Sequence, residues 1–278
     1  MAGWLPPRGR DVHKYEAGSV LVIGGSPRYA GAGELACRAA LRSGAGLVTL
    51  AAAGRYPGGW PEVMHWPLDW DDEPLDSIRA SPRADARVIG PGLDAVAPGL
   101  LAEVIGLAAA PTVLDAGALQ DSAELRRAVR EHGRCVLTPH EGEAARLLGA
   151  SVAEVRADRA GAARKIARLT GATVVLKGSE TLVLSPDGRE ALCDRGHPGM
   201  ATGGSGDALA GCLGALLCTV GDSFNAACLA AFACGAAGEW AALRHGNGLI
   251  PSDTIAGLGA VLMRLEDRLP LDGGSGQG

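Results

Sequence analysis

The sequence predicts an α/β protein whose central, mainly parallel sheet is covered by helices on both faces. Short runs rich in β-branched residues alternate with longer helical patterns almost to the C-terminus, an order typical of βαβ units. Apolar residues make up 47% of the 278 residues and aromatic residues only 4%, so alanine and glycine must fill a closely packed core. No linker or internal repeat interrupts the pattern. We therefore expect one domain over residues 1–270 and a disordered, glycine-rich tail over 271–278.

Six apolar runs predict buried parallel strands, and turn and capping signals separate them from helices. The strands are expected at 19–23, 47–51, 87–89, 112–115, 135–138 and 173–177, and the helices between them at 33–43, 98–109, 121–132, 141–149 and 152–170. Asp121 with Glu124 and Ser151 with Glu154 have N-capping spacing, and Gly133 suits a helix end. The turn 186–188 predicts an antiparallel hairpin of 181–184 and 190–193. Further helices are expected at 207–219, 223–245 and 252–268.

Charge and cysteine content limit the partners and the environment of the chain. Lys and Arg total 26 against 31 Asp and Glu, a net charge of −5, and no basic run is present, so nucleic acid is not an expected partner. The seven cysteines have no Cys-x-x-Cys spacing, which fits free thiols in a reducing compartment. The N-terminus lacks an apolar signal core, and the longest apolar stretches, 208–221 and 226–238, fall short of the ~20 residues of a membrane span. We expect a cytoplasmic protein without a membrane partner.

Assembly is suggested by one further segment. The alanine- and cysteine-rich helix around 226–240 is suited to pack either inside the subunit or against a second copy of the chain. A homo-oligomer is therefore expected, with its order left open.

The most informative segment is Gly199-Met200-Ala201-Thr202-Gly203-Gly204-Ser205-Gly206-Asp207, which runs directly into an apolar helix. Glycines without a Cβ let backbone amides approach an anion, and a helix N-terminus adds partial positive charge. A phosphoryl group in transfer needs this environment, and the Asp207 carboxylate can take the proton of an attacking substrate hydroxyl. The structural alternative makes Asp207 a helix cap and the glycines a turn. Four glycines within eight residues favour the functional interpretation.

Other candidate segments lie after predicted strands, where parallel sheets bind ligands. Residues 31–36 match a dinucleotide fingerprint, but the strand ends near Ile23 and no acid follows where ribose would bind, so a nicotinamide-dependent reductase is not expected. The turn 90–92 is tight and can touch substrate. Residues 177–181 offer a cation and hydroxyls or form an ordinary hairpin. Residues 138–143, with His140, begin a helix whose two acids also suit its dipole. No zinc spacing or nucleophilic triad is present.

Taken together and in this order, these motifs resemble the carbohydrate-kinase-like NAD(P)H-hydrate dehydratase family, a branch of the ribokinase-like fold. The resemblance covers nearly the whole chain, and the glycine–aspartate segment is its most specific part. The matching segments are His13–Tyr15, Gly18–Ser26, Tyr29–Ala32, Ala39–Val48, Glu62–Met64, Gly90–Leu93, Leu137–His140, Val175–Gly178 and Gly199–Asp207. The resemblance implies a three-layer α/β/α sandwich.

The resemblance also implies a hydro-lyase that repairs hydrated NADH or NADPH. Family members use ADP or ATP, with Mg²⁺, to restore the reduced cofactor, and bacterial members generally use ADP. Phosphorylation of the ring hydroxyl would turn a poor leaving group into phosphate, which then departs by elimination. The partners of this chain would be the hydrated cofactor and the nucleotide.

Site residues follow from the same matching. Gly204, Ser205 and Gly206 would stabilise the phosphoryl group, and Asp207 would activate the ring hydroxyl. Contacts to the hydrated cofactor would come from Ala32, Gly92, His140 and Asp207. The nucleotide would be held by Lys177, Gly178, Ser179, Glu180, Thr181 and Gly206. Glu143 is the candidate metal ligand.

Some positions depart from the family pattern, and two other functions fit the same segments. Gly117 and Gln120 replace an acid and an asparagine, His197 stands where asparagine is common, and Cys234 where histidine is frequent. These changes leave the anion site intact but bear on substrate contacts near Gly117 and His197. The alternatives are a vitamin or sugar kinase on the same fold and a nucleotide-sensing binding protein without turnover.

Overall fold

The computed structural model describes residues 3–53, 59–94 and 96–266, and its strands form one sheet in the order β3-β2-β1-β4-β5-β6-β7-β8-β9. Neighbouring strands from β3 to β7 are parallel, and β8 and β9 form the predicted antiparallel hairpin. The strands are β1 (Ser19–Ile23), β2 (Leu47–Ala52), β3 (Met64–Pro67), β4 (Ala86–Ile89), β5 (Thr112–Leu114), β6 (Cys135–Leu137), β7 (Thr173–Leu176), β8 (Thr181–Leu184) and β9 (Glu190–Cys193).

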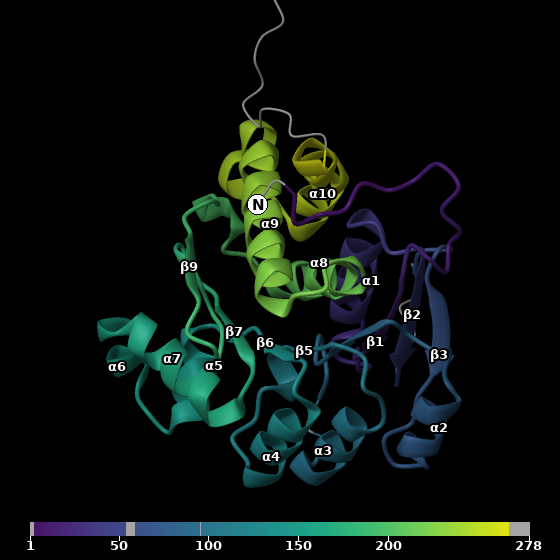
Figure 1. The fold of residues 1–278 in the computed structure, drawn as a ribbon, viewed down its shortest axis with the longest axis vertical. Coiled ribbons are helices and arrows are strands. Elements are labelled where there is room, and N and C mark those ends of the chain that lie inside the picture. The colour runs from purple at the N-terminus through teal and green to yellow at the C-terminus, as the bar shows by residue number, and fades with distance from the viewer. Residues whose placement is uncertain (1–2, 54–58, 95, 267–278) are drawn as a thin grey trace, which may run out of the picture.

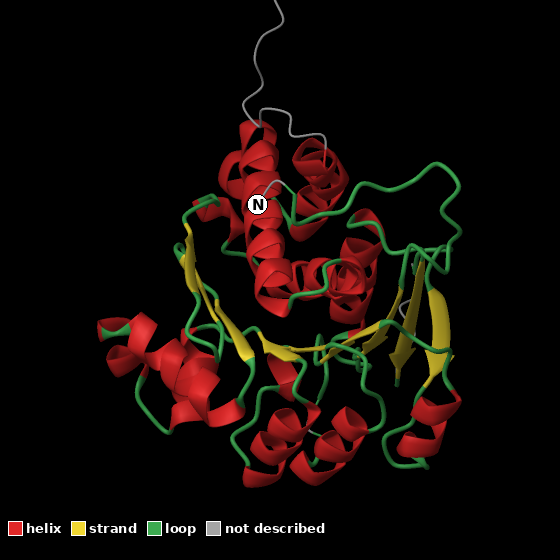
Figure 2. Ribbon diagram, in the orientation of Figure 1, coloured by secondary structure: helices red, strands yellow, loops and turns green. Residues whose placement is uncertain are grey.

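Helices cover both faces of this sheet (Figures 1 and 2). One face carries α1 (Ala30–Arg42), α8 (Ser205–Thr219), α9 (Ser223–His245) and α10 (Pro251–Glu266). The other carries α2 (Pro74–Ala80), α3 (Pro98–Gly106), α4 (Ala123–His132), α5 (Glu141–Leu148), α6 (Val152–Ala157) and α7 (Arg159–Thr170). Alternate residues of a strand enter opposite cores: Val20 and Val22 the first, Leu21 and Ile23 the second. The predicted three-layer architecture is thus confirmed.

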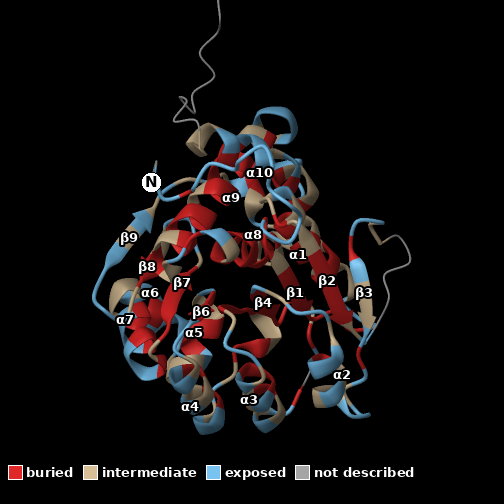
Figure 3. Ribbon diagram, turned by 45° about the vertical axis from the view of Figure 1, so that its right-hand side comes forward, coloured by how far each residue is buried: buried red, intermediate tan, exposed pale blue. Residues whose placement is uncertain are grey.

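Burial follows position in the sheet (Figure 3). The central strands β4, β5 and β7 are buried at every residue, which explains their continuous apolar runs. The edge strands β3 and β9 are only partly buried. The strong strand signals in the sequence therefore coincide with the strands that are covered on both faces.

Several expected elements differ in the structure. Strand β3 and helix α2 were not predicted. The single helix expected over 152–170 is two helices, because the chain turns at Asp158, whose side chain caps α7 by accepting from the Gly161 amide at 2.8 Å. Ser122, rather than Asp121, caps α4. Helices α1 and α8 each begin earlier than expected, at Ala30 and Ser205.

Other local predictions are confirmed. Ser151 and Glu154 form the reciprocal capping box at the start of α6. Gly133 ends α4 in the left-handed conformation, with φ of 71°. The predicted bounds of α9 agree with the structure. The tail 271–278 and the last two residues expected in the final helix lie outside the described residues.

Helix α8 is seated by two glycines that replace side-chain packing with direct backbone contact. At Gly211 an added Cβ would strike the Ala36 carbonyl oxygen of α1. At Gly214, two turns along the helix from Asp207, it would lie 2.5 Å from Val88 Cγ2 of β4. The small-residue core predicted from composition is therefore used to hold α8 tightly between α1 and the sheet.

Helix α9 is the one candidate among the described residues for crossing a membrane by length and composition. The segment 223–248 has a mean hydropathy of 1.5, but 72% of its apolar window is buried inside the protein. A core helix passes the same test, and α9 packs against α8, α10 and the sheet. The expectation of a buried helix here is confirmed.

Candidate functional site

The sheet changes its direction of growth between β1 and β4, because β2 and β3 are added on one side of β1 and later strands on the other. Ligands of open α/β sheets bind beyond the carboxyl ends of the strands at such a point. Here the loops after β1 and β4 touch, since the Gly25 amide donates to the Pro91 carbonyl at 2.8 Å. Gly92 has φ of 65°, and a side chain there would lie 2.8 Å from the Cβ of Ala32. The structure therefore brings together the predicted substrate contacts Ala32 and Gly92.

The next strand ends carry a cluster of four charged side chains, defined here as the Lys177 cluster: Asp115, Glu143, Lys177 and Asp207. Asp115 follows β5 and is 1% exposed. Its Oδ1 accepts from Lys177 Nζ at 2.6 Å and from Thr138 Oγ1 at 2.7 Å. Glu143 Oε2 lies 3.6 Å from the same ammonium. Three strand ends and the start of α8 thus converge on one lysine.

The N-terminus of α8 faces this cluster. Gly204 is the N-cap residue and is left-handed, with φ of 98°, while Ser205 Oγ donates to the Met200 carbonyl at 2.8 Å. A Cβ at Gly206 would lie 3.2 Å from Lys177 Nζ and 3.8 Å from Asp115 Oδ2. The absence of that side chain leaves space between the helix N-terminus and the lysine. Amide donors, a helix dipole and an ammonium group are therefore grouped as anion binding requires.

Asp207 lies in the first turn of α8, and its carboxylate accepts no hydrogen bond from the described part of the chain. The structural alternative, in which it caps the helix, is therefore wrong. The pKa of Asp207 is raised to about 7, chiefly by burial and also by the nearby carboxylates of Asp115 and Glu143, while Lys177 opposes the rise. An acid with a pKa near neutrality is suited to accept and return a proton at physiological pH.

Lys177 remains charged within this group. Burial alone disfavours the ammonium form, but Asp115 and Glu143 outweigh burial, and the pKa of Lys177 is raised. The cluster thus contains a cation that neighbouring carboxylates hold in place, and an acid, Asp207, that accepts no hydrogen bond from the described residues.

His140 and Glu143 form the N-terminal cap of α5. His140 Nδ1 accepts from the amides of Gly142 at 2.9 Å and Glu143 at 3.2 Å, so the ring proton is on Nε2, which lies 3.4 Å from Glu143 Oε1. Glu143 Oε2 in turn accepts from the His140 amide at 2.7 Å. The His140 side chain is 58% exposed. Glu143 therefore belongs to the Lys177 cluster and His140 borders it, and the two residues also have a structural function as a helix cap.

The predicted nucleotide segment, residues 177–181, forms the loop between β7 and β8. The Lys177 amide donates to the Pro139 carbonyl at 2.8 Å, and Thr181 Oγ1 donates to the Gly178 carbonyl at 3.2 Å. Ser179 and Glu180 are exposed, and their side chains form no hydrogen bond or ion pair with the described residues. Of this segment, only Lys177 reaches the cluster.

Sequence reasoning missed the contacts of Asp115 and Thr138 in the Lys177 cluster and the contact of Arg159 with the loop after β7. An acid directly after a buried parallel strand was the available signal for Asp115. Thr138 lies in a motif that was noted, but its bond to Asp115 depends on the pairing of β5 with β6. Arg159 is one of several arginines in a helical pattern, and no sequence signal distinguishes it.

Of the four departures from the family pattern, the side chains of Gln120, His197 and Cys234 have partners in the structure. Gln120 Nε2 donates to the carbonyls of Val96 at 3.1 Å and Gly117 at 2.9 Å. His197 caps a short 3₁₀ turn through Nδ1, which accepts from the Gly199 amide at 3.0 Å. Cys234 is buried beside Cys212. None of the four belongs to the Lys177 cluster.

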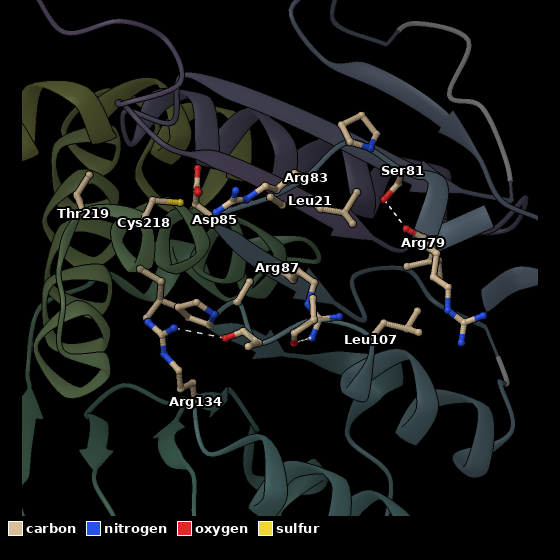
Figure 4. Close-up of a pocket in the computed structure, with 18 of the residues that line it drawn as sticks. Leu21, Arg79, Ser81, Arg83, Asp85, Arg87, Leu107, Arg134, Cys218 and Thr219 are labelled. Atoms are coloured by element: carbon tan, nitrogen blue, oxygen red, sulfur yellow. Dashed lines mark hydrogen bonds between the residues drawn. The ribbon is translucent and has the colours of Figure 1, made fainter. Parts of the chain in front are cut away.

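A cavity of about 600 Å³ lies at the opposite, amino-terminal edge of the sheet (Figure 4). Arg87, at its centre, donates to the carbonyls of Val104 at 2.8 Å, Ile105 at 2.7 Å and Ala108 at 2.9 Å. Burial lowers the pKa of Arg87 to about 10. This guanidinium closes the C-terminal end of α3, where a cation is favourable. The charge of Arg87 is therefore structural, and the Lys177 cluster lies at the other edge of the sheet.

Oxygen donors for a hard cation are present in the Lys177 cluster, namely Asp115, Glu143 and Asp207. Within the described ranges, however, no group of three or more His, Cys, Asp or Glu side chains is arranged to hold a metal. Mg²⁺ commonly binds one or two carboxylates together with substrate phosphates. The residues fit a magnesium ion that also binds phosphate, rather than a preformed cage.

Comparison with known proteins agrees with this geometry. The family model described as NAD(P)H-hydrate dehydratase matches residues 20–258. The chain is 43% identical over 245 residues to the ADP-dependent (S)-NAD(P)H-hydrate dehydratase of Neisseria meningitidis, covering 84% of this chain and 80% of that protein. It is 39% identical over 282 residues to a bifunctional NAD(P)H-hydrate repair enzyme of Moorella thermoacetica, and there it spans 95% of this chain but 53% of the relative. The chain thus covers about half the length of such bifunctional relatives.

A solved structure extends the likeness to three dimensions. The ADP/ATP-dependent NAD(P)H-hydrate dehydratase of Bacillus subtilis, co-crystallised with ATP and Mg²⁺, superposes with a TM-score of 0.79 at 29% identity, covering 94% of this chain and 95% of that chain. The predicted ribokinase-like three-layer fold is confirmed by this match and by the sheet order.

Proposed function

Because this chain belongs to the NAD(P)H-hydrate dehydratase family, we propose that it is an ADP-dependent hydro-lyase that converts hydrated NADH or NADPH back to the reduced cofactor. The observation that carries the proposal is the position of Asp207, a partly buried carboxylate with a pKa of about 7 and no capping function, beside a lysine at the N-terminus of a helix. The names of the Neisseria and Bacillus relatives support the same substrates.

The proposed reaction has two steps. In the first, Asp207 takes the proton from the ring hydroxyl of the hydrated nicotinamide as that oxygen attacks the β-phosphorus of ADP, and AMP leaves. In the second, phosphate departs from the ring carbon and a proton is lost from the adjacent ring carbon, which restores the double bond. The sum is hydrated NADH plus ADP giving NADH, AMP, inorganic phosphate and the proton that Asp207 took in the first step.

The chain's own residues have separate functions in this scheme. The amides at Gly204, Ser205 and Gly206 and the Lys177 ammonium would stabilise charge on the transferred phosphoryl group. Ala32, Gly92 and His140 would contact the hydrated cofactor, which places its ring at the change in sheet direction. Residues 177–181 and Gly206 would hold the nucleotide. Support comes from the contacts that connect Gly206, Lys177 and Asp115.

Mg²⁺ is the proposed cofactor, with Glu143 as the protein ligand. When bound, the ion would neutralise phosphate charge, which a site containing three carboxylates needs. Glu143 is 5% exposed and lies at the edge of the cluster nearest α5. This position supports a metal that bridges the protein and the phosphates.

We also propose that residues 1–270 act as one domain, that the chain assembles with copies of itself, and that it works in the cytoplasm. The substrates of the proposed reaction are soluble intracellular metabolites, which supports the location. The continuous sheet from β3 to β9 supports one domain over the described residues.

Turnover of hydrated NADH tests the proposal directly. Purified protein with hydrated NADH, Mg²⁺ and either ADP or ATP should restore the absorbance of reduced nicotinamide, and Asp207→Asn should not. A protein that instead phosphorylates a pyrimidine or thiazole alcohol to a stable product is a kinase. A protein that binds nucleotide equally well with and without the Asp207 carboxylate, and turns over nothing, is a sensor. Either result would overturn the dehydratase proposal.

A further inference from the structure

Arg159, at the start of α7, holds the loop between β7 and β8 through its main chain. Its Nη2 donates to the carbonyls of Leu176 at 3.2 Å, Lys177 at 3.3 Å and Glu180 at 2.9 Å. A single guanidinium therefore binds both ends of the loop 177–180, which lies outside the β ladder. Figure 1 shows α7 beside α5 and β7, in the position that these contacts require.

The guanidinium is itself anchored. Arg159 Nη1 donates to Glu141 Oε1 at 3.2 Å, and Glu141 begins α5, two residues before Glu143. The side chains of Arg159 and Glu141 are only 20% and 22% exposed. A partly buried, hydrogen-bonded ion pair of this kind holds its geometry better than an exposed one. The loop is thus tied to the helix that carries His140 and Glu143.

Gly178 fits this arrangement because it has no side chain. A Cβ at Gly178 would strike both terminal nitrogens of Arg159. The glycine of this loop therefore lets the guanidinium lie directly against the main chain. Glycine suits this position because a side chain would clash with Arg159, and its φ is not in the left-handed region.

The direction of the carbonyl groups fixes the direction of the amides. In a trans peptide the C=O of one residue and the N–H of the next point to opposite sides. Because Arg159 binds the Lys177 carbonyl, the Gly178 amide points away from α7. Within the described chain, the amides of Gly178, Ser179 and Glu180 donate to no backbone acceptor. The contacts of Arg159 therefore leave the Gly178 amide as an unpaired N–H donor on the side away from α7, and such donors bind anions.

We propose that Arg159, anchored by Glu141, is the positioning residue of the nucleotide site: it holds the main chain of residues 177–180 so that the Gly178 amide faces the nucleotide. This inference rests on the proposed function for the identity of the ligand. Arg159 touches neither Asp207 nor the predicted substrate contacts, and Asp115 and Glu143 hold the Lys177 ammonium without it. It therefore acts on nucleotide binding and leaves the chemical step unchanged.

The test compares Arg159→Gln with Arg156→Gln. Arg156 also pairs with Glu141, at 2.6 Å, but it is 68% exposed and makes no contact with the loop. We expect Arg159→Gln to raise the KM and the directly titrated Kd for ADP about tenfold, as the loss of charged hydrogen bonds implies. The kcat and the KM for hydrated NADH should stay within about twofold of wild type. Arg156→Gln should match wild type in all four values.

A second readout does not depend on turnover. Hydrogen exchange of the peptide that spans residues 177–181, without nucleotide, should be faster in Arg159→Gln than in wild type and unchanged in Arg156→Gln. If wild type turns over no hydrated cofactor but the exchange and ADP affinity change as expected, the dehydratase proposal fails and the positioning of the loop stands.

Three results would overturn the inference. The first is a folded Arg159→Gln protein with wild-type ADP affinity and wild-type exchange. The second is an equal effect of Arg156→Gln. The third is a loss of kcat at unchanged nucleotide KM. If Arg159→Gln fails to fold, Glu141→Gln decides: it keeps the guanidinium but removes its anchor, so ADP affinity should fall about threefold, and an unchanged affinity overturns the inference.

Discussion

Replacing Asp207 by asparagine is expected to stabilise the protein while abolishing its activity. In the folded chain, burial raises the pKa of Asp207 from an ordinary 3.8 to about 7. Between these two pH values the folded state keeps a proton that the unfolded state has lost. The free energy of unfolding contributed by this group therefore falls as the pH rises from about 4 to about 7, and is constant above.

The size of the effect follows from the same shift. A difference of about three pKa units corresponds to ~4 kcal/mol, and relaxation of the site reduces it, so we expect about 2 kcal/mol. Asp207→Asn should be more stable than wild type by this amount at pH 8, with the difference shrinking towards pH 5. Loss of the base should lower kcat by roughly 10²- to 10⁴-fold.

Urea denaturation at pH 8 and pH 5, together with kcat, measures both effects. Asp222→Asn is a matched control of opposite sign, because Asp222 caps α9 and a hydrogen bond from Arg189 lowers its pKa. That variant should lose the same stability at pH 8 and pH 5, because the contribution of Asp222 is lost only as the pH falls below about 4. Two results would contradict this reasoning: an Asp207→Asn protein that is less stable than wild type at pH 8, or one that gains equally at both pH values. Either would mean that burial does not destabilise the Asp207 carboxylate in the folded protein.

Three further outcomes follow from the Lys177 cluster. The kcat/KM of wild type should rise about tenfold per pH unit up to about pH 7, where Asp207 ionises, and level off above; a profile flat through that range contradicts the assignment of the base. Gly206→Ala places a methyl 3.2 Å from Lys177 Nζ and should weaken ADP binding about tenfold by titration, whereas Gly203→Ala, which meets nothing within 4 Å, should not. Lys177→Met leaves Asp115 buried without its cation and should lower the free energy of unfolding, measured in urea, by about 3 kcal/mol. Adding Asp115→Asn to this variant should restore most of the lost stability.

Much of the fold could be predicted because the central strands are buried on both faces and so appear as continuous apolar runs. Strand β3 could not, since its pattern is set by pairing with β2 at the sheet edge, where Met64 and Pro67 are exposed. The break between α6 and α7 was missed because the helical pattern continues through Asp158, and only its side-chain bond to Gly161 shows that a new helix begins.

The candidate site, too, could be predicted from the sequence only in part. The glycines before α8 and the acid within its first turn form a local motif, so Asp207 was predicted from neighbouring residues. Asp115 acquires its function from Thr138 and Lys177, which lie 23 and 62 residues further along the chain. Such partners are brought together by sheet order, and a single sequence does not specify that order. The His140 and Glu143 prediction identified the right helix end but not their mutual cap.

The close contact of α8 with α1 and β4 decides how the proposed active site can be altered. Gly211 and Gly214 fix the axial and rotational setting of the helix one and two turns beyond Asp207. A methyl introduced at either position would move the proton acceptor as a rigid body, without changing any group that meets the reactants. Directed evolution of this scaffold toward other alcohols should therefore yield changes in the loops after β1 and β4, while these two remote positions stay glycine.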